Sequence, residues 1–336
     1  MTTIEIEKIQ ELLTHPKKII LVTHWSPDGD AIGSSLGLYN YLLLGKHDVK
    51  VIVPNDYPPF LNWMEGNDKI LNYQKDPVNS IKSVNEAEII FLLDFNSLKR
   101  IDELGKHIEE SAAFKIMIDH HLQPDPIAQI FHHDVKKSST AELVFDFICL
   151  LGDENKINKS VAECLYTGIM TDTGSFRFPS TSAQTHRAIA CLLEVGANHA
   201  EIHNRIYDDN SEDKIHLLGF CLNEKLKVLP QFNTAYITLD EAEQKKFKCK
   251  KGDTEGFVNY ALSIRDIKLA AFFAERDGLI KTSFRSKGNF DVNLFARKHF
   301  DGGGHKNAAG GASQLSMKET VDKFILVLEE YKSEII

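Results

Sequence analysis

A short apolar run that ends in a cluster of acidic and histidine side chains is the most constraining feature of this sequence. Residues 19–22 (Ile-Ile-Leu-Val) predict a buried strand, and residues 24–30 read H-W-S-P-D-G-D. The proline and glycine of this segment favour a tight turn, and residues 31–44 have helical periodicity. The segment therefore predicts a strand, a turn and a helix, and at the carboxyl end of the strand it places His24, Asp28 and Asp30.

The alternation of strands and helices continues through the first half of the chain. Apolar runs predict strands at residues 18–23, 49–54, 88–93, 115–118 and 128–131, and helical patterns occupy residues 4–15, 31–44, 140–151, 161–170 and 183–194. Such alternation predicts an α/β fold with a mainly parallel sheet flanked by helices. Ligands bind at the carboxyl ends of the strands in open sheets of this kind.

The length of 336 residues exceeds one ordinary domain. Residues 197–229 are polar and helical in pattern, and strands are expected again at 234–239, 268–275 and 279–285, before a last helix at 317–331. We therefore expect a first domain over residues 1–195, a helical linker over 196–230 and a second, smaller α/β domain over 231–336.

Composition restricts the kind of substrate and the compartment. The net charge of −9 disfavours long duplex nucleic acid, which is bound through many phosphate contacts, but it permits a small anion held by metals and a local basic patch. No apolar run approaches the roughly 20 residues of a membrane span, and the first residues lack the features of a signal peptide. The five cysteines include no C-x-x-C pair. We expect a cytoplasmic protein with no membrane association.

Three further acidic or histidine clusters follow apolar segments. Asp94 ends the run 89–93, the triplet at 119–121 (D-H-H) ends the run 114–118, and Asp172 lies in a T-D-T-G sequence after an apolar helix. Each cluster alone has a plain alternative, because a polar turn or a helix cap uses the same residues. Asp30, for instance, is a candidate N-cap, and Gly29 is expected to let the backbone bend. The pair at 132–133 (H-H) is expected to be structural or exposed.

Together the four clusters are more specific than any one of them. They supply histidine nitrogens and hard carboxylate oxygens, which suit a divalent ion such as Mn²⁺. Their number is sufficient for two ions that share a bridging carboxylate. Two such ions about 3.5–4 Å apart can hold both oxygens of a phosphoryl displacement. The sequence therefore predicts a hydrolytic site with two metals.

These motifs resemble the DHH phosphoesterases. The segment H-x-x-P-D-G-D-A-I-G-S, the aspartate after a later apolar strand, D-H-H and T-D-T-G occur in the family's order, and S-F-R-S at 283–286 with G-G-G-H-K-N-A-A-G at 302–310 is similar to the associated DHHA1 domain. The combination looks most like the bifunctional oligoribonuclease (nanoRNase) and pAp phosphatase branch. The sequence shows no sensor or transmembrane domain of the kind that membrane-bound cyclic-dinucleotide phosphodiesterases of the family carry.

The resemblance implies a role for each matching residue. His24, Asp28 and Asp94 would hold one Mn²⁺, and a second would be held by Asp30, Asp94, His120 and Asp172, with Mg²⁺ or Co²⁺ as substitutes. His121 would contact the scissile phosphate, and Asp119 would support the histidines. In the DHHA1 domain, substrate would be bound by Arg285, Gly302, Gly303, Gly304 and His305. The three glycines are expected to expose backbone N–H groups to a phosphate.

The implied substrates are short single-stranded oligonucleotides, pAp or linear dinucleotides such as pApA. Alternatives are a cyclic-dinucleotide phosphodiesterase, an inorganic pyrophosphatase or polyphosphatase, and a nucleotide-binding protein without activity. The sequence leaves open the direction of degradation, a homodimeric state and the roles of Arg265, Arg297 and the lysine-rich segment Lys245–Lys251.

Overall fold

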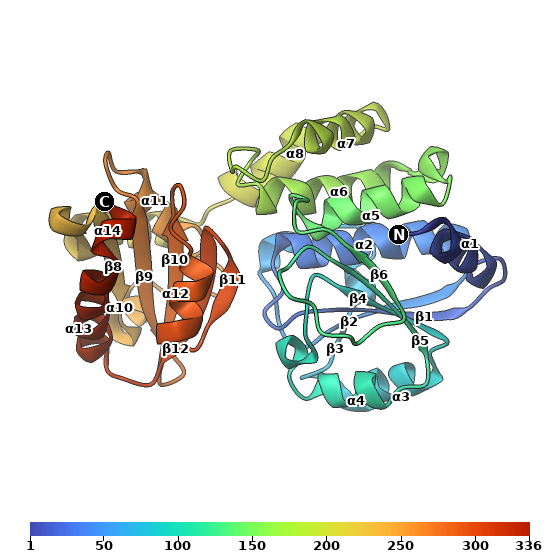
Figure 1. Cartoon of the computed structure of the whole chain (residues 1–336), viewed down its shortest axis with the longest axis horizontal. Coiled ribbons are helices and arrows are strands. Elements are labelled where there is room, and N and C mark those ends of the chain that lie inside the picture. The colour runs from blue at the N-terminus through green and yellow to red at the C-terminus, as the bar shows by residue number, and fades with distance from the viewer. The chain divides into compact units, whose positions relative to one another are not determined.

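The computed structural model describes all of residues 1–336, which form two compact units, Met1–Asp209 and Asn210–Ile336 (Figure 1). The division between them falls inside the segment 196–230. None of the helices combines the length and the apolar character that crossing a membrane would require.

The first unit contains a six-stranded sheet in which every pair of neighbours is parallel. The spatial order is β3-β2-β1-β4-β5-β6, so the order reverses between β1 and β4. The prediction of a parallel sheet is confirmed. The two-residue strand β3 was not predicted, and β6 begins two residues later than expected. The strands are β1 (Lys18–Thr23), β2 (Asp48–Val53), β3 (Leu71–Asn72), β4 (Ile89–Leu93), β5 (Phe114–Asp119) and β6 (Ile130–His133).

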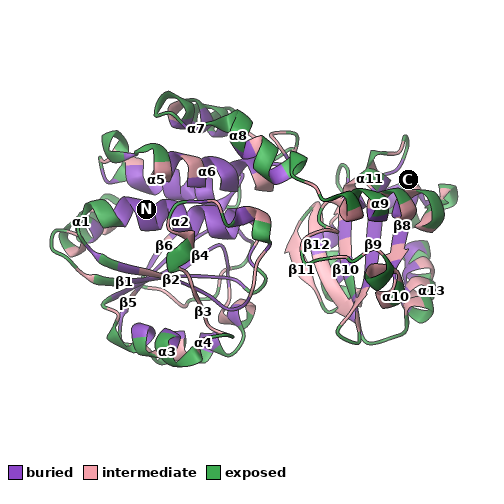
Figure 2. Ribbon diagram, turned by 180° about the vertical axis from the view of Figure 1, so that it is seen from behind, coloured by how far each residue is buried: buried purple, intermediate pink, exposed green.

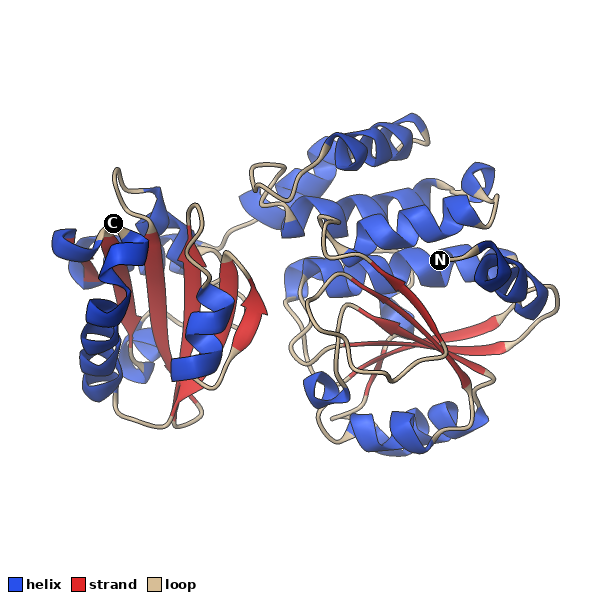
Figure 3. Ribbon diagram, in the orientation of Figure 1, coloured by secondary structure: helices blue, strands red, loops and turns tan.

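Helices cover both faces of this sheet, as Figures 1 and 3 show. Alternate residues of β1 enter different cores: Ile19 and Leu21 pack on the side of α2, α5 and α6, while Ile20 and Val22 pack on the side of α3 and α4. The two helices α3 and α4 were not predicted. The helices are α1 (Thr3–Leu12), α2 (Gly29–Leu44), α3 (Pro77–Glu86), α4 (Leu104–Glu110), α5 (Thr140–Leu150), α6 (Lys159–Asp172), α7 (Ala183–Glu194) and α8 (His199–His203).

Helices α2 and α6 pack closely because glycines line their contact. A methyl group added at Gly33 would lie 2.6 Å from the carbonyl oxygen of Cys164 and 2.7 Å from the backbone nitrogen of Gly168. A methyl group added at Gly37 would instead meet the side chain of Leu165. This contact belongs to the large buried region in Figure 2 and positions the N-terminus of α2 beside the C-terminus of α6.

The second unit is built on a mixed sheet in the order β11-β12-β10-β9-β8-β7, antiparallel except for the β8–β9 pair. The predicted hairpin between β9 and β10 is confirmed, and its turn residues Asp277 and Gly278 have positive φ angles of 52° and 72°. The strands are β7 (Leu226–Leu229), β8 (Thr234–Leu239), β9 (Leu269–Arg276), β10 (Leu279–Ser286), β11 (Gly303–His305) and β12 (Ala308–Ser313).

Two features of the second unit differ from the sequence-based expectation. Residues 226–229 have a helical pattern in sequence but form β7, because they pair with β8. The glycine-rich segment contains β11, which pairs with β12, and neither of these strands was predicted. The helices here are α9 (Glu212–Phe220), α10 (Glu241–Lys246), α11 (Phe257–Ser263), α12 (Val292–His299), α13 (Met317–Leu328) and α14 (Lys332–Ile335).

The glycine contact between α2 and α6 makes a prediction about stability. Gly33→Ala should cost about 2–3 kcal/mol of unfolding free energy, because backbone atoms of α6 must move to admit the methyl group. Gly37→Ala should cost less than about 1 kcal/mol, since the Leu165 side chain can rotate and alanine favours the helix. Urea unfolding of both variants measures the difference, and equal losses would contradict this account of the packing.

Candidate metal centre

Five chain segments bring acidic and histidine side chains to the carboxyl edge of the parallel sheet. His24 follows β1, Asp94 follows β4, and the D-H-H triplet ends β5. Asp28 and Asp30 lie at the start of α2, and Asp172 is the last residue of α6. Because β1 and β4 are the neighbours between which the strand order reverses, the cluster occupies the position where open α/β sheets bind ligands.

The first group of candidate ligands consists of His24, Asp28 and Asp94. The Nε2 atom of His24 lies 3.3 Å from Oδ2 of Asp94 and 4.0 Å from Oδ1 of Asp28. The other ring nitrogen of His24, Nδ1, donates to the carbonyl oxygen of Trp25 at 2.9 Å. That bond orients the ring so that Nε2 is directed at the two carboxylates, the orientation that metal coordination requires.

The second group consists of Asp30, His120 and Asp172, and Asp94 lies beside it. Nε2 of His120 lies 3.9 Å from Oδ2 of Asp30, 3.6 Å from Oδ2 of Asp172 and 3.6 Å from Oδ1 of Asp94. Asp94 therefore directs one carboxylate oxygen to each group. The structure brings together the same two sets of side chains, joined through Asp94, that the family resemblance implies.

The spacing and the donor types of both groups fit divalent cations. Ligand atoms that bind one ion at about 2.0–2.2 Å lie roughly 3–4 Å from each other. The nitrogen–oxygen separations of 3.3–4.0 Å in the two groups match that range. Carboxylate oxygens with imidazole nitrogens are a donor set for ions such as Mn²⁺.

The electrostatics of the cluster also favour a cation. Asp30 and Asp94 are each only 2% exposed. Burial, and then the negative charges of Asp94 and Asp172, raise the pKa of Asp30 well above its usual range. Burial opposes ionisation of Asp94 as well, but the hydrogen bond from His24 and the charges of the neighbouring histidines outweigh it and lower the pKa of that carboxyl.

Asp119 and His121 form a buried pair beside the two groups. Nδ1 of His121 donates to Oδ1 of Asp119 at 2.7 Å, and Asp119 is fully buried. The carbonyl oxygen of His121 accepts a hydrogen bond from Nε2 of His133 at 2.6 Å. The ring of His121 is thus oriented by a carboxylate.

The N-terminus of α5 was missed by the sequence reasoning, although it contacts three candidate ligands. Both oxygens of Asp30 accept backbone hydrogen bonds there, from Thr140 at 2.6 Å and from Ala141 at 2.9 Å. The Thr140 hydroxyl donates to Oδ1 of Asp94 at 2.8 Å, and the Lys137 carbonyl accepts from Nδ1 of His120 at 3.2 Å. The two serines before the helix at 140–151 and the threonine that begins it were the available signal.

Two local interpretations of the first motif were wrong. Asp28, not Asp30, is the N-cap of α2, and its Oδ1 accepts from the backbone of Asp30 and Ala31. Gly29 does not have a positive φ angle; it is required because a Cβ there would collide with the Thr171 side chain of α6. The residue of this turn with a positive φ angle, 54°, is Ser26.

The histidine pair at 132–133 is structural, as expected. His132 is buried in β6, where Nε2 donates to the carbonyl oxygen of Leu143, and burial lowers the pKa of His132 to about 4. The ring is therefore neutral at ordinary pH.

In the second unit, Arg285 and His305 lie in one row across the sheet. Arg285 of β10 is paired with Ala308 of β12, and Ala308 is paired in turn with His305 of β11. Directly paired residues project from the same face, and strands separated by one neighbour are about 10 Å apart. Two polar side chains thus flank a small alanine on one face.

The glycines of the G-G-G-H segment have steric reasons in the structure. A Cβ at Gly302 would collide with the carbonyl oxygen of Gly310, and one at Gly304 would lie 2.5 Å from the carbonyl oxygen of Ala308. The N–H of Gly304 donates to the Asn293 side chain at 3.0 Å. One of the three N–H groups expected to face a phosphate is therefore bonded within the protein.

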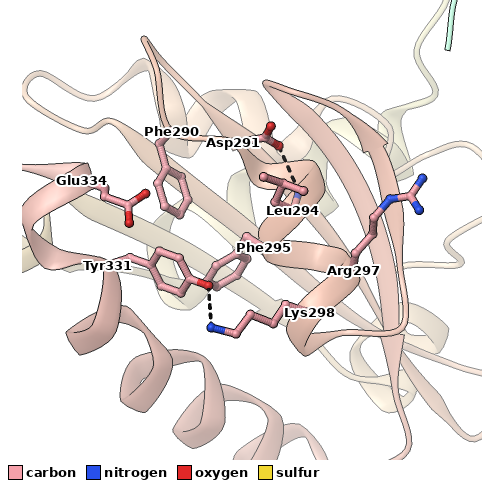
Figure 4. A pocket seen from close by; sticks show the side chains of 8 residues that line it. All are labelled: Phe290, Asp291, Leu294, Phe295, Arg297, Lys298, Tyr331 and Glu334. Atoms are coloured by element: carbon pink, nitrogen blue, oxygen red, sulfur yellow. Dashed lines mark hydrogen bonds between the residues drawn. The ribbon is translucent and has the colours of Figure 1, made fainter. Parts of the chain in front are cut away.

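Arg265, Arg297 and the lysines of the segment Lys245–Lys251, whose roles the sequence left open, are exposed. The Asn293 oxygen that binds Gly304 also accepts from Nε of Arg297 at 3.0 Å. Arg297 is one of the residues that line a pocket with Phe290, Phe295 and Tyr331, and its guanidinium points away from these rings (Figure 4). Within the lysine-rich segment Lys245–Lys251, Lys245 pairs with Glu241 and Lys248 pairs with Asp213.

Comparisons with known proteins agree with this organisation. The family model for the DHH family, N-terminal domain, matches residues 18–169, and the model for the DHHA1 domain matches residues 232–334. The chain is 30% identical over 313 residues to the bifunctional oligoribonuclease and PAP phosphatase NrnA of Bacillus subtilis, with 93% of each chain covered. It is 32% identical over 319 residues to the protein of the same name from Thermus thermophilus, with 94% of this chain and 90% of that protein covered.

A solved structure is also similar over the whole chain. The crystal structure of an exopolyphosphatase-related protein from Bacteroides fragilis has a TM-score of 0.95 and 43% sequence identity, and the match covers 99% of this chain and 98% of that one. With matched domains in the same order and alignments of full length, the chain belongs to the DHH family of phosphoesterases and carries the DHHA1 domain.

Proposed function

We propose that the protein is a phosphoesterase that requires two divalent ions and hydrolyses short oligonucleotides, pAp and linear dinucleotides such as pApA. The observation that carries the proposal is the arrangement of two ligand groups joined through the Asp94 carboxylate. The names of the Bacillus and Thermus relatives, oligoribonuclease and PAP phosphatase, support the choice of substrates.

The residues that would hold the metals follow from the two groups. His24, Asp28 and Asp94 would bind one ion, and the second would be bound by Asp30, Asp94, His120 and Asp172. We propose Mn²⁺ as the preferred ion, with Mg²⁺ or Co²⁺ as substitutes. When bound, two such ions supply Lewis acidity and neutralise charge on a phosphoryl group.

His121 is proposed to contact the scissile phosphate. Its Nδ1 proton is held by the buried carboxylate of Asp119 at 2.7 Å, so Nε2 is the atom that can face substrate. In contact with a phosphoryl oxygen, His121 would stabilise the charge that develops there.

The second unit is proposed to bind the nucleotide. Arg285 and His305 project from one face of its sheet, and an arginine can bind a phosphate through two parallel hydrogen bonds. Ala308 between them leaves room for a ligand group. We propose that Gly302, Gly303 and Gly304 keep the backbone of this region close and that the two polar side chains make the contacts.

Exposed apolar side chains beside the ligands favour a nucleotide over inorganic phosphate chains. Trp25 follows His24 and is 40% exposed, and Leu122 follows the D-H-H triplet and is 39% exposed. An exposed indole can stack on a base, a contact worth about 1–3 kcal/mol. Inorganic polyphosphate has no surface that would use such a contact.

A substrate panel decides between this proposal and its alternatives. The panel contains pAp, pApA, very short RNAs, a long RNA, cyclic di-AMP and inorganic pyro- and polyphosphate. We expect the highest kcat/KM for pAp, pApA and the very short RNAs. Faster release of phosphate from polyphosphate, or selective opening of cyclic di-AMP, would contradict the substrate assignment without removing the metal site.

Metal dependence is the first prediction. Chelation should abolish hydrolysis, and Mn²⁺ should restore it better than Mg²⁺, because the ligands are hard oxygens and imidazoles. Metal binding should also raise the melting temperature, since ions that bind only the folded state stabilise it and relieve repulsion between buried carboxylates. Full activity after exhaustive chelation would exclude the metal mechanism.

Asp94→Asn is the second prediction. Asp94 has a φ angle of 66°, and asparagine tolerates this left-handed conformation, so the fold should be retained. The rate should fall by at least about a hundredfold, because an amide is a poor bridge between two cations. Steady-state kinetics measure the loss, and circular dichroism checks the fold. A folded variant with nearly normal activity would show that Asp94 does not join the two sites.

The third prediction separates nucleotide binding from the chemical step. Arg285→Ala and His305→Ala should each lower kcat/KM for pApA about 10–100-fold, the value of one charge-assisted hydrogen bond. Both variants should still bind two Mn²⁺ ions. Bis-p-nitrophenyl phosphate, which lacks a nucleotide, should be affected far less. Arg265→Ala is the control for loss of one positive charge in the same unit; equal losses on both substrates would refute a nucleotide-binding role.

A further inference from the structure

We infer that Glu142 is a positioning residue for the second ligand group, and that it acts by fixing residues 137–141, a segment we call the strap. The inference rests on the metal assignment of the proposed function, but not on the identity of the substrate. It concerns a buried glutamate that contacts none of the candidate ligands itself.

Glu142 is the acceptor at the centre of a buried hydrogen-bond network. It is the third residue of α5 and only 1% exposed. Oε2 accepts from the backbone N–H and the hydroxyl of Ser138 at 3.1 and 2.6 Å, and from the hydroxyl of Thr185 at 2.9 Å. Oε1 accepts from Nζ of Lys137 at 3.1 Å. Four donors therefore depend on one carboxylate.

The charge of Glu142 is compatible with this role. Burial opposes ionisation, but the hydrogen bonds from Ser138 and Lys137 outweigh it and lower the pKa of Glu142. The Lys137 ammonium supplies the opposite charge and also pairs with Asp146 at 2.6 Å. The buried carboxylate thus remains an acceptor for all four donors.

The strap connects Glu142 to the second ligand group and, in the first group, only to the shared Asp94. Lys137 orients the ring of His120 through its carbonyl oxygen, and the N–H groups of Thr140 and Ala141 hold both oxygens of Asp30. The hydroxyl of Thr140 holds Oδ1 of Asp94, the oxygen that faces the second group. His24 and Asp28 are instead oriented by Trp25 and by the start of α2.

This asymmetry distinguishes positioning from general support of the fold. Glu142→Gln keeps the size of the side chain but replaces one acceptor oxygen with a donor, so Lys137 or Ser138 loses its partner and the strap must shift. Loss of an orienting contact around metal ligands costs about 10–100-fold in metal affinity. A role in folding alone would lower stability and leave the two affinities in their original ratio.

The test is a titration of the full chain with Mn²⁺. Binding is measured by calorimetry and by the electron paramagnetic resonance signal of free Mn²⁺. Wild type should bind two ions. Glu142→Gln should bind one with unchanged affinity and the other at least about tenfold more weakly. Ser138→Ala, which removes only the hydroxyl bond at 2.6 Å, should weaken the same ion to a smaller extent and serves if Glu142→Gln does not fold.

The control variant is Asp146→Asn, because Asp146 pairs with the same Lys137 ammonium one turn along α5. It should leave both Mn²⁺ affinities within about threefold of wild type, because no backbone group of the strap loses a hydrogen-bond partner. A loss equal to that of Glu142→Gln would overturn the inference in favour of a simple charge effect.

Double variants identify the ion that is weakened. In Asp172→Asn the second group has already lost a ligand, so adding Glu142→Gln should change the measured Mn²⁺ affinities little. In Asp28→Asn, adding Glu142→Gln should weaken binding of the ion that the second group still holds. Equal weakening of both ions, or unchanged binding in a folded variant, would overturn the inference. If wild type binds two ions but hydrolyses no nucleotide, the proposed substrate fails and the role of Glu142 stands.

Discussion

The burial of several carboxylates at one edge of a parallel sheet is the constraint on which the rest of the first unit depends. Asp30 and Asp94 are almost inaccessible, and the charge of Asp172 acts on Asp30. Uncompensated buried charge is very costly, so the fold must supply positive or hydrogen-bonding partners. It supplies them from the N-terminus of α5, whose N–H groups bind Asp30, and from imidazoles that face Asp94.

The packing of α2 against α6 brings two of these carboxylates together. Asp30 lies in the first turn of α2 and Asp172 ends α6, and the two residues share one ligand group only because these helices pack closely. Glycines make that approach possible: a Cβ at Gly168 would lie 2.9 Å from Oδ1 of Asp30 and 2.5 Å from the Cβ of Ala141. The position of the carboxylates thus depends on the close packing of α2 and α6, which explains why glycines recur along α2.

In the second unit, small residues and glycines allow strands to approach each other closely. Its sheet is covered by apolar clusters, and a row of small residues in β12 lies between the strands that carry Arg285 and His305. The glycines that precede His305 permit close contact between β11 and β12, and one N–H among them is bonded to Asn293. The glycines of the G-G-G-H segment therefore serve the pairing of β11 with β12, which fixes the position of His305 in the sheet.

Much of this could be predicted from the sequence because the information is local. Apolar runs followed by turn residues predicted β1, β4 and β5, and the candidate ligands come directly after them. The D-G turn predicted the β9–β10 hairpin. The family motifs are contiguous as well, so they indicated which side chains would form each group before any geometry was known.

Only the tertiary structure decided how those side chains are held. Asp28 rather than Asp30 caps α2, because Asp30 is engaged by α5, which lies 110 residues away along the chain. The strap, Glu142 and the pairing of the glycine-rich segment into β11 and β12 carry no local pattern that assigns their partners. Hydrogen bonds between distant segments and close backbone contacts are set by packing, and sequence periodicity contains no information about which surfaces meet. The sequence by itself determined the strands that precede the candidate ligands and the residue types of the candidate site, and the fold determined its geometry.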